Sequence, residues 1–183
     1  PHVCLKRFFF FLNKGEYVFL VDEAHNLVDR AREMYSASIC KEELLEIKRM
    51  IGSDYGKRII NAFERCNRNL LELKRQCENE YMIIESEDLF SLNMERLGEE
   101  ISVFMEKNKN FPNMKELSQF FFKVKHYNAM HEVLDENYMI YTEHAKEGFV
   151  IKLFCVNPSV NLEQRINAGI NAVFFSATLL PVN

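Results

Sequence analysis

The sequence is poor in the residues that interrupt helices. Its 183 residues include six glycines and four prolines, and this low content favours long helices over many tight turns. It also has no apolar run near the roughly 20 residues that a membrane-spanning helix needs. The longest candidate, Phe8–Leu12, is far too short, so we expect no membrane partner.

Cysteine patterns that bind metals are absent as well. The five cysteines are scattered and none form a C-x-x-C pair, which argues against a zinc or iron–sulfur site within this chain. Cys66 and Cys77 would lie about 16 Å apart on one helix, too far for a disulfide. We expect the reduced, mostly buried thiols of a cytosolic protein at Cys4, Cys40, Cys66, Cys77 and Cys155.

No phosphate loop of the form Gly-x-x-x-x-Gly-Lys-Ser/Thr occurs in the chain, which excludes a complete phosphate-loop motor. The chain starts at Pro1 and no signal-peptide pattern follows. We expect it to be a segment of a longer protein, with any targeting signal outside it.

An overall excess of positive charge is also missing, because the net charge is −4. The distribution is uneven, however. Residues 54–77 hold six basic and three acidic residues, residues 78–106 hold nine acidic residues against Arg96, and residues 107–125 are basic again. A hairpin of such segments would present one basic and one acidic edge. The simpler interpretation is that they are solvated helix faces that pair with each other.

What is present is a strong helical pattern in the middle of the chain. Apolar residues recur at alternating spacings of four and three, in three runs separated by breaks near residues 81–87 and before Pro112. A shorter helix is expected over Lys41–Ile51, and the whole set implies an antiparallel bundle. The three seams are Ile59, Phe63, Cys66, Leu70, Leu73 and Cys77; Phe90, Met94, Leu97, Ile101 and Phe104; and Leu117, Phe120, Phe121, Val124, Tyr127 and Leu134.

Towards both ends the pattern changes to that of strands. Tyr17–Val21 and Ala172–Phe175 are continuous apolar runs, typical of strands buried on both faces of a parallel sheet. Tyr138–Thr142 and Phe149–Val156 predict a hairpin. We also expect short helices over residues 26–35 and 159–169, a helix or connecting segment over 1–12, and a turn over 13–16.

Together these elements predict a mainly α fold, in which an antiparallel helical bundle carries a small β-hairpin and two flanking strands. With 48% hydrophobic and 27% charged residues, the composition is that of an ordinary globular protein. We expect three parts along the chain. Residues 1–40 hold the first flanking strand, residues 41–136 hold the helical bundle, and residues 137–183 hold the hairpin and the last strand.

A short polar motif follows each of the two flanking strands. Asp22-Glu23-Ala24-His25 (DEAH) follows the first, and Ser176-Ala177-Thr178 (SAT) follows the last. Either motif alone is a weak signal, since so short a match arises by chance. Their order, each after a buried strand and with a helical insert between them, is more specific.

This order resembles the DinG/XPD-type superfamily 2 DNA helicases, in which a helical arch domain is inserted into the first motor domain between these two motifs. Asn157-Pro158-Ser159 and Thr178–Pro181 fit the same pattern, and residues 41–136 resemble the arch. The resemblance implies that the flanking strands are neighbours in a RecA-like α/β sheet. It also implies that the phosphate loop and any iron–sulfur cluster precede this segment and that the second motor domain follows it, so the segment alone would be inactive.

The resemblance further implies a role for each motif residue in the hydrolysis of ATP with Mg²⁺. Asp22, at the carboxyl end of a strand, would hold the Mg²⁺, and Glu23 would polarise the attacking water. His25 would link the nucleotide site to the second motif, where Ser176 and Thr178 would be its hydroxyl partners.

In this family the arch helps to guide single-stranded DNA. Single-strand sites combine basic residues with aromatic rings, and two groups fit: four cations near Tyr55, and two lysines beside His126 and Tyr127. We interpret the seam phenylalanines as core, and His126, His131 and His144 as surface or capping groups rather than metal ligands. The candidate DNA contacts are Lys57, Arg58, Arg65, Arg68, Lys123 and Lys125.

The predicted function is therefore that of a fragment of an ATP-dependent DNA helicase, with 5′–3′ translocation on single strands and a role in DNA repair. Its partners would be single-stranded DNA and the rest of the helicase chain, in the cytoplasm or, in a eukaryote, the nucleus. Two alternatives stay open. One is a helical protein-interaction module whose motif matches are accidental, and the other is a degenerate helicase relative that has lost its motor.

Overall fold

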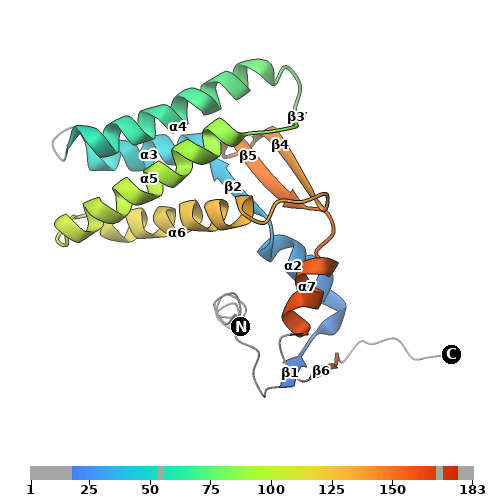
Figure 1. The fold of residues 1–183 in the computed structure, drawn as a ribbon. Coiled ribbons are helices and arrows are strands. Elements are labelled where there is room, and N and C mark those ends of the chain that lie inside the picture. Colours follow the sequence, from blue (N-terminus) through green and yellow to red (C-terminus); the bar gives the residue numbers. More distant parts are fainter. Residues whose placement is uncertain (1–17, 53–55, 168–170, 177–183) are drawn as a thin grey trace. The chain divides into compact units, whose positions relative to one another are not determined.

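The computed structural model describes residues 18–52, 56–167 and 171–176. Among them lie six α-helices and six strands, drawn in Figure 1. The chain divides into two compact units. Of the described residues, the first unit holds 18–35, 155–167 and 171–176, and the second holds 36–52 and 56–154. The predicted helical content with a small antiparallel sheet is confirmed.

Four helices form the body of the second unit, and they lie side by side in Figure 1. They are α3 (Lys41–Ile51), α4 (Lys57–Gln76), α5 (Asp88–Lys107) and α6 (Met114–His131). Helix α4 packs on α3 and α5, and α6 packs on α5 and α3. Because apolar residues three and four positions apart share one helix face, the predicted seams become the interior: Phe63, Leu97 and Phe120 are fully buried.

Aromatic rings tie these helices together. Phe63 stacks on Phe120 with ring centroids 6.0 Å apart, and Phe90 meets Tyr127 edge to face at 5.6 Å. Each buried ring stabilises the fold by roughly 1.5–3 kcal/mol through the apolar area that it removes from water. The core assignment of the seam phenylalanines is confirmed, except that Phe121 is half-buried.

A four-stranded antiparallel sheet completes the second unit, in the order β2-β5-β4-β3. The predicted hairpin is present as β4 (Tyr138–Ala145) and β5 (Gly148–Cys155). Strand β2 (Ala37–Cys40) and strand β3 (Tyr81–Ile84) were not predicted. Both are four residues long, and so short a run carries too little periodicity to be recognised in sequence.

These two short strands change the domain boundaries. β2, which precedes α3, pairs with β5, and β3, which lies between α4 and α5, pairs with β4. The hairpin therefore belongs to the helical unit, which spans Ser36–Phe154, whereas the sequence suggested boundaries after residues 40 and 136.

The first unit holds the two flanking strands, β1 (Val18–Val21) and β6 (Asn171–Phe174), with the 3-10 helix η1 (Ala24–Asn26) and helices α2 (Leu27–Met34) and α7 (Ser159–Ile166). The strands are parallel neighbours, as predicted, with Val18 opposite Asn171 and Val21 opposite Phe174. The prediction that they are buried on both faces is wrong, because Leu20 is 72% and Val173 48% exposed. The buried Tyr35 donates a hydrogen bond to the Asn161 carbonyl at 3.3 Å, which ties the end of α2 to α7.

Some predictions fall outside the described residues: the helix and turn over residues 1–16, and Thr178 of the SAT motif. Among the helices that are described, none is long and apolar enough to cross a membrane.

Candidate functional site

The two sequence motifs come together at one edge of the β1–β6 pair. Parallel strands end at the same edge, and here Val21 lies opposite Phe174. The residues that follow are fixed to each other through the backbone. The Phe175 N–H donates to the Val21 carbonyl at 3.0 Å, and the Ala24 N–H donates to the Phe175 carbonyl at 3.1 Å. DEAH and the start of SAT are therefore held side by side.

Glu23 takes an unusual backbone conformation at this edge. With φ 53° and ψ 47° it is left-handed, and among the described residues it is the one non-glycine residue with positive φ. This conformation costs an ordinary residue about 1–2 kcal/mol. Its N–H donates to Asp22 Oδ1 at 2.8 Å, and its carbonyl accepts from the Asn26 N–H at 2.9 Å. Such strain is often retained where a side chain must point in a particular direction.

The side chains of Glu23, His25 and Ser176 form one hydrogen-bonded cluster across the two motifs. His25 Nδ1 lies 2.7 Å from Ser176 Oγ, Ser176 Oγ donates to Glu23 Oε2 at 3.2 Å, and His25 Nδ1 lies 3.2 Å from Glu23 Oε2. If Ser176 donates to the carboxylate, its oxygen accepts from a proton on Nδ1, which fixes the histidine tautomer.

This cluster is open to water, because the side chains of His25 and Glu23 are 40% and 42% exposed. An ion pair at that exposure contributes at most about 1 kcal/mol to stability. The arrangement is therefore better suited to holding side chains in position than to stabilising the fold. The sequence analysis had identified all three residues as candidates. The structure brings them into contact, although His25 and Ser176 are 151 positions apart in the sequence.

Asp22 is exposed at the carboxyl end of β1. Among the residues described, no group of three or more metal-ligating side chains is found. Mg²⁺, however, is commonly held by one or two carboxylates together with water and substrate phosphates. An exposed carboxylate at this edge of a parallel pair fits that mode of binding, so Asp22 could hold the metal of a magnesium–nucleotide complex.

The candidate DNA-contacting residues differ in whether other side chains of the protein already pair with them. Those on α4 are all exposed and none forms an ion pair with another described residue: Lys57, Arg58, Arg65 and Arg68. On α6, Lys123 pairs with Glu43 at 2.5 Å, and the Lys125 ammonium lies 5.7 Å from the centre of the Phe121 ring. Tyr127 beside them is fully buried, so it offers no ring to a base. The exposed cations of α4 are the better candidates.

The sequence predicts that His126, His131 and His144 are surface or capping groups. In the structure His144 is exposed and the other two are half-buried. His126 Nε2 lies 2.9 Å from the Ser36 carbonyl, and His144 Nε2 lies 3.3 Å from the Cys77 carbonyl. His131 Nε2 lies 3.5 Å from the carboxylate of Glu87. Each links elements that are distant in sequence, a role that spacing along the chain does not reveal.

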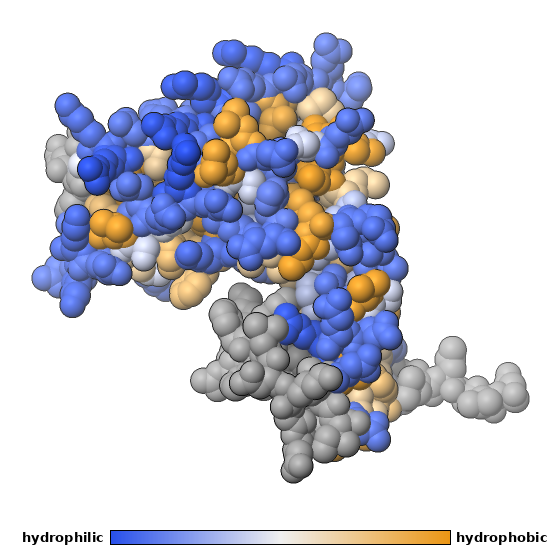
Figure 2. Space-filling view, in the orientation of Figure 1, coloured by the Kyte–Doolittle hydropathy of each residue, from blue (hydrophilic) through white to orange (hydrophobic). Residues whose placement is uncertain are grey.

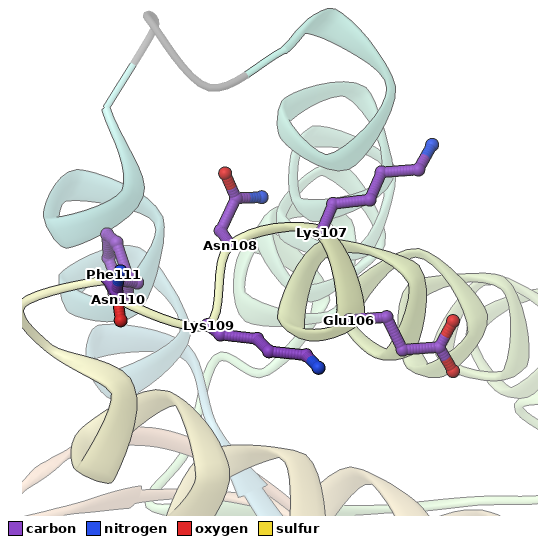
Figure 3. Close-up of a pocket in the computed structure, with 6 residues that line it drawn as sticks. All are labelled: Glu106, Lys107, Asn108, Lys109, Asn110 and Phe111. Atoms are coloured by element: carbon purple, nitrogen blue, oxygen red, sulfur yellow. The ribbon is translucent and has the colours of Figure 1, made fainter.

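A hollow of about 520 Å³ lies at the turn between α5 and α6, lined by residues 106–111. Figure 3 shows that its side chains spread in different directions, with Lys107 pointing away from Lys109. Binding pockets instead bring polar groups from several elements towards one point. This hollow is lined by one short segment, and we assign it no function.

Comparison with known proteins adds no family to this description. No protein-family model matches the chain, and no curated protein matches it. What indicates a function is therefore the geometry of the two motifs.

Proposed function

We propose that this chain is a segment of an ATP-dependent DNA helicase of the DinG/XPD type, whose parent protein translocates 5′–3′ on single-stranded DNA in DNA repair. The observation that supports the proposal is the contact of His25 with Ser176 at the shared edge of β1 and β6. Accidental matches to DEAH and SAT would have no reason to meet, in the right order, at the carboxyl ends of neighbouring parallel strands.

In this proposal each residue of the cluster has a chemical task. Asp22 would hold the Mg²⁺ of the nucleotide, and the metal would supply positive charge that neutralises the phosphates. Glu23 accepts a proton from the water that attacks the γ-phosphate. The same carboxylate accepts a hydrogen bond from Ser176. A change of charge at the nucleotide would therefore alter the hydrogen bonds of Ser176 and His25. In this way the state of the nucleotide would affect the SAT motif.

The second unit then corresponds to the arch. Its helices and four-stranded sheet lie in sequence between the two motifs, and its α4 carries four exposed cations suited to a phosphate backbone. The phosphate loop, any iron–sulfur cluster and the second motor domain would lie elsewhere in the parent protein. The parent helicase would act in the cytoplasm, or in the nucleus of a eukaryote.

The proposal is tested by the DNA-stimulated ATPase activity of the full-length parent, wild type against Glu23→Gln. The amide cannot accept the proton, so we expect turnover to fall by at least about 100-fold while nucleotide binding is retained. Glu33→Gln, at an exposed position on α2, is the matched control and should leave turnover unchanged.

Unchanged turnover in Glu23→Gln would contradict the proposal. Absence of DNA-stimulated turnover in the wild type would also contradict it, and would favour a helical interaction module or a degenerate helicase relative.

A further inference from the structure

Strand β3 is an exposed edge of the four-stranded sheet. It pairs with β4 on one side and is last in the strand order, with no further strand beyond it among the described residues. Two apolar side chains of this short strand face solvent: Tyr81 is 61% exposed and Ile83 is 57% exposed. An edge strand leaves its outer N–H and C=O groups available to another strand.

The outward side chains continue onto β4. The register places Ile83 opposite Tyr141 and Tyr81 opposite Glu143, and Met139 of β4 is also exposed. We call Tyr81, Ile83, Met139 and Tyr141 the β3 patch. Figure 2 shows hydrophobic surface over the end of this unit where the sheet lies, set among hydrophilic side chains.

Apart from its short length of four residues, the edge lacks the features that usually prevent pairing with another strand. Proteins protect such edges with lysine, proline or a bulge, whereas Tyr81–Ile84 contains neither charge nor proline and pairs with β4 in continuous register. Acidic residues instead flank the strand in sequence, although the Lys152 ammonium lies close to the β3 patch, 5.7 Å from the centre of the Tyr141 ring. From Glu78 to Asp88 there is no lysine or arginine, and Glu78, Glu80 and Glu85 are exposed.

We infer that the β3 edge binds an extended, basic segment of a partner protein, which adds to the sheet as a further strand. Main-chain hydrogen bonds would supply affinity, and alternate apolar side chains would contact the β3 patch. Basic residues at the ends of the segment would face the exposed glutamates, and this complementarity sets specificity.

The same acids disfavour the other occupants. A second copy that pairs antiparallel through β3 would bring Glu80 towards Glu85 of the other molecule, and like charges opposite each other are destabilising. A nucleic-acid backbone would meet the same repulsion. The inference uses the second unit alone and does not depend on the proposed helicase function.

The test uses the full chain and a labelled peptide of alternating valine and threonine with two arginines at each end, measured by fluorescence anisotropy. An otherwise identical peptide with glutamates in place of the arginines is the control ligand. We expect the basic peptide to bind and the acidic peptide to bind at least about tenfold more weakly. Hydrogen exchange should show added protection of the β3 amides in the complex.

Variants of the chain sharpen this test. Glu80→Lys with Glu85→Lys should reverse the preference between the two peptides, whereas Glu99→Lys, at an exposed site on α5, should leave it unchanged. Ile83→Lys should weaken binding of the basic peptide at least about tenfold, because it places a charge on the edge.

Three results would overturn the inference: equal binding of the two peptides, no binding of either, or protection confined to residues outside β3. The inference would also be overturned if the unliganded chain forms a dimer that the Ile83→Lys substitution converts to a monomer. The occupant of the edge would then be a second copy of this chain.

Discussion

At the scale of single residues, the buried carboxyl group of Glu87 links the start of α5 to α6. Its side chain is fully enclosed and lies 3.5 Å from His131 Nε2. Burial raises the pKa of Glu87 from 4.5 to about 7, although the Tyr127 hydroxyl and the Ser91 N–H oppose the shift. The folded state thus holds a proton that the unfolded chain releases at lower pH.

Stability should therefore depend on pH in a defined direction. Because the folded-state pKa is the higher one, the free energy of unfolding should fall as pH rises from about 4.5 to about 7 and then level off. Glu87→Gln should remove this slope and be more stable at pH 8, by at most about 3 kcal/mol. Denaturant unfolding at several pH values measures both, with the exposed Glu85→Gln as control. An identical pH slope in Glu87→Gln and wild type would contradict the assignment.

Gly148, which opens β5, is a position where the backbone and its surroundings require glycine. Its φ is 137°, and an added Cβ would collide with the Glu42 carboxylate. That carboxylate accepts a hydrogen bond from the Phe149 N–H at 2.7 Å and so joins α3 to the hairpin. Burial alone would raise the pKa of Glu42, but this hydrogen bond, with the charges of Lys41 and Lys74, lowers it.

We expect Gly148→Ala to destabilise the protein by about 3 kcal/mol, from backbone strain and displacement of Glu42. Gly52→Ala is the comparison, because Gly52 also has positive φ but has no atom within 4 Å of the added Cβ; it should cost roughly half as much. Urea unfolding measures the two values. Equal losses would show that the contact with Glu42 contributes nothing.

At the scale of elements, helix α4 presents Arg65 and Arg68 to solvent three positions apart. If both bind phosphates, the double substitution Arg65→Ala, Arg68→Ala should weaken single-stranded DNA binding by the parent protein. It should also reduce the slope of log K against log salt by about 1.4, because each phosphate that an arginine neutralises contributes about 0.7 to that slope.

Lys123→Ala is the control for this measurement, because Lys123 is already paired with Glu43 and should change the slope little. If the slope is unchanged in the double variant, or changes equally in the control, these arginines of α4 do not bind the DNA.

The elements differ in how well sequence predicts them. Helices α4, α5 and α6 were predictable because Phe63, Leu97 and Phe120 belong to long seams whose period is repeated many times. For strand β3 the sequence predicts only a break between helices, since Tyr81–Ile84 has no period of its own and becomes a strand by pairing with β4. Glu87 lies in an acidic run that suggests exposure, and its burial comes from the packing of α5 against α6.

At the scale of the whole molecule, the candidate site depends on contacts that no local pattern contains. His25 and Ser176 are 151 positions apart, and they meet because β1 and β6 are parallel neighbours with a whole unit of the chain between them in sequence. Composition and periodicity predicted the two strands. Their pairing was expected from the order of the motifs, through the resemblance to helicases, and the left-handed turn at Glu23 was not anticipated.

The central claim is that the contact between His25 and Ser176 couples nucleotide hydrolysis to work on DNA. The most direct test is the number of base pairs separated per ATP hydrolysed by the full-length parent, wild type against Ser176→Ala, with Gln164→Ala, at an exposed position on α7, as the control in the same unit. We predict that Ser176→Ala hydrolyses ATP within a few-fold of wild type but separates at least about tenfold fewer base pairs per ATP. An unchanged ratio in Ser176→Ala would contradict the claim.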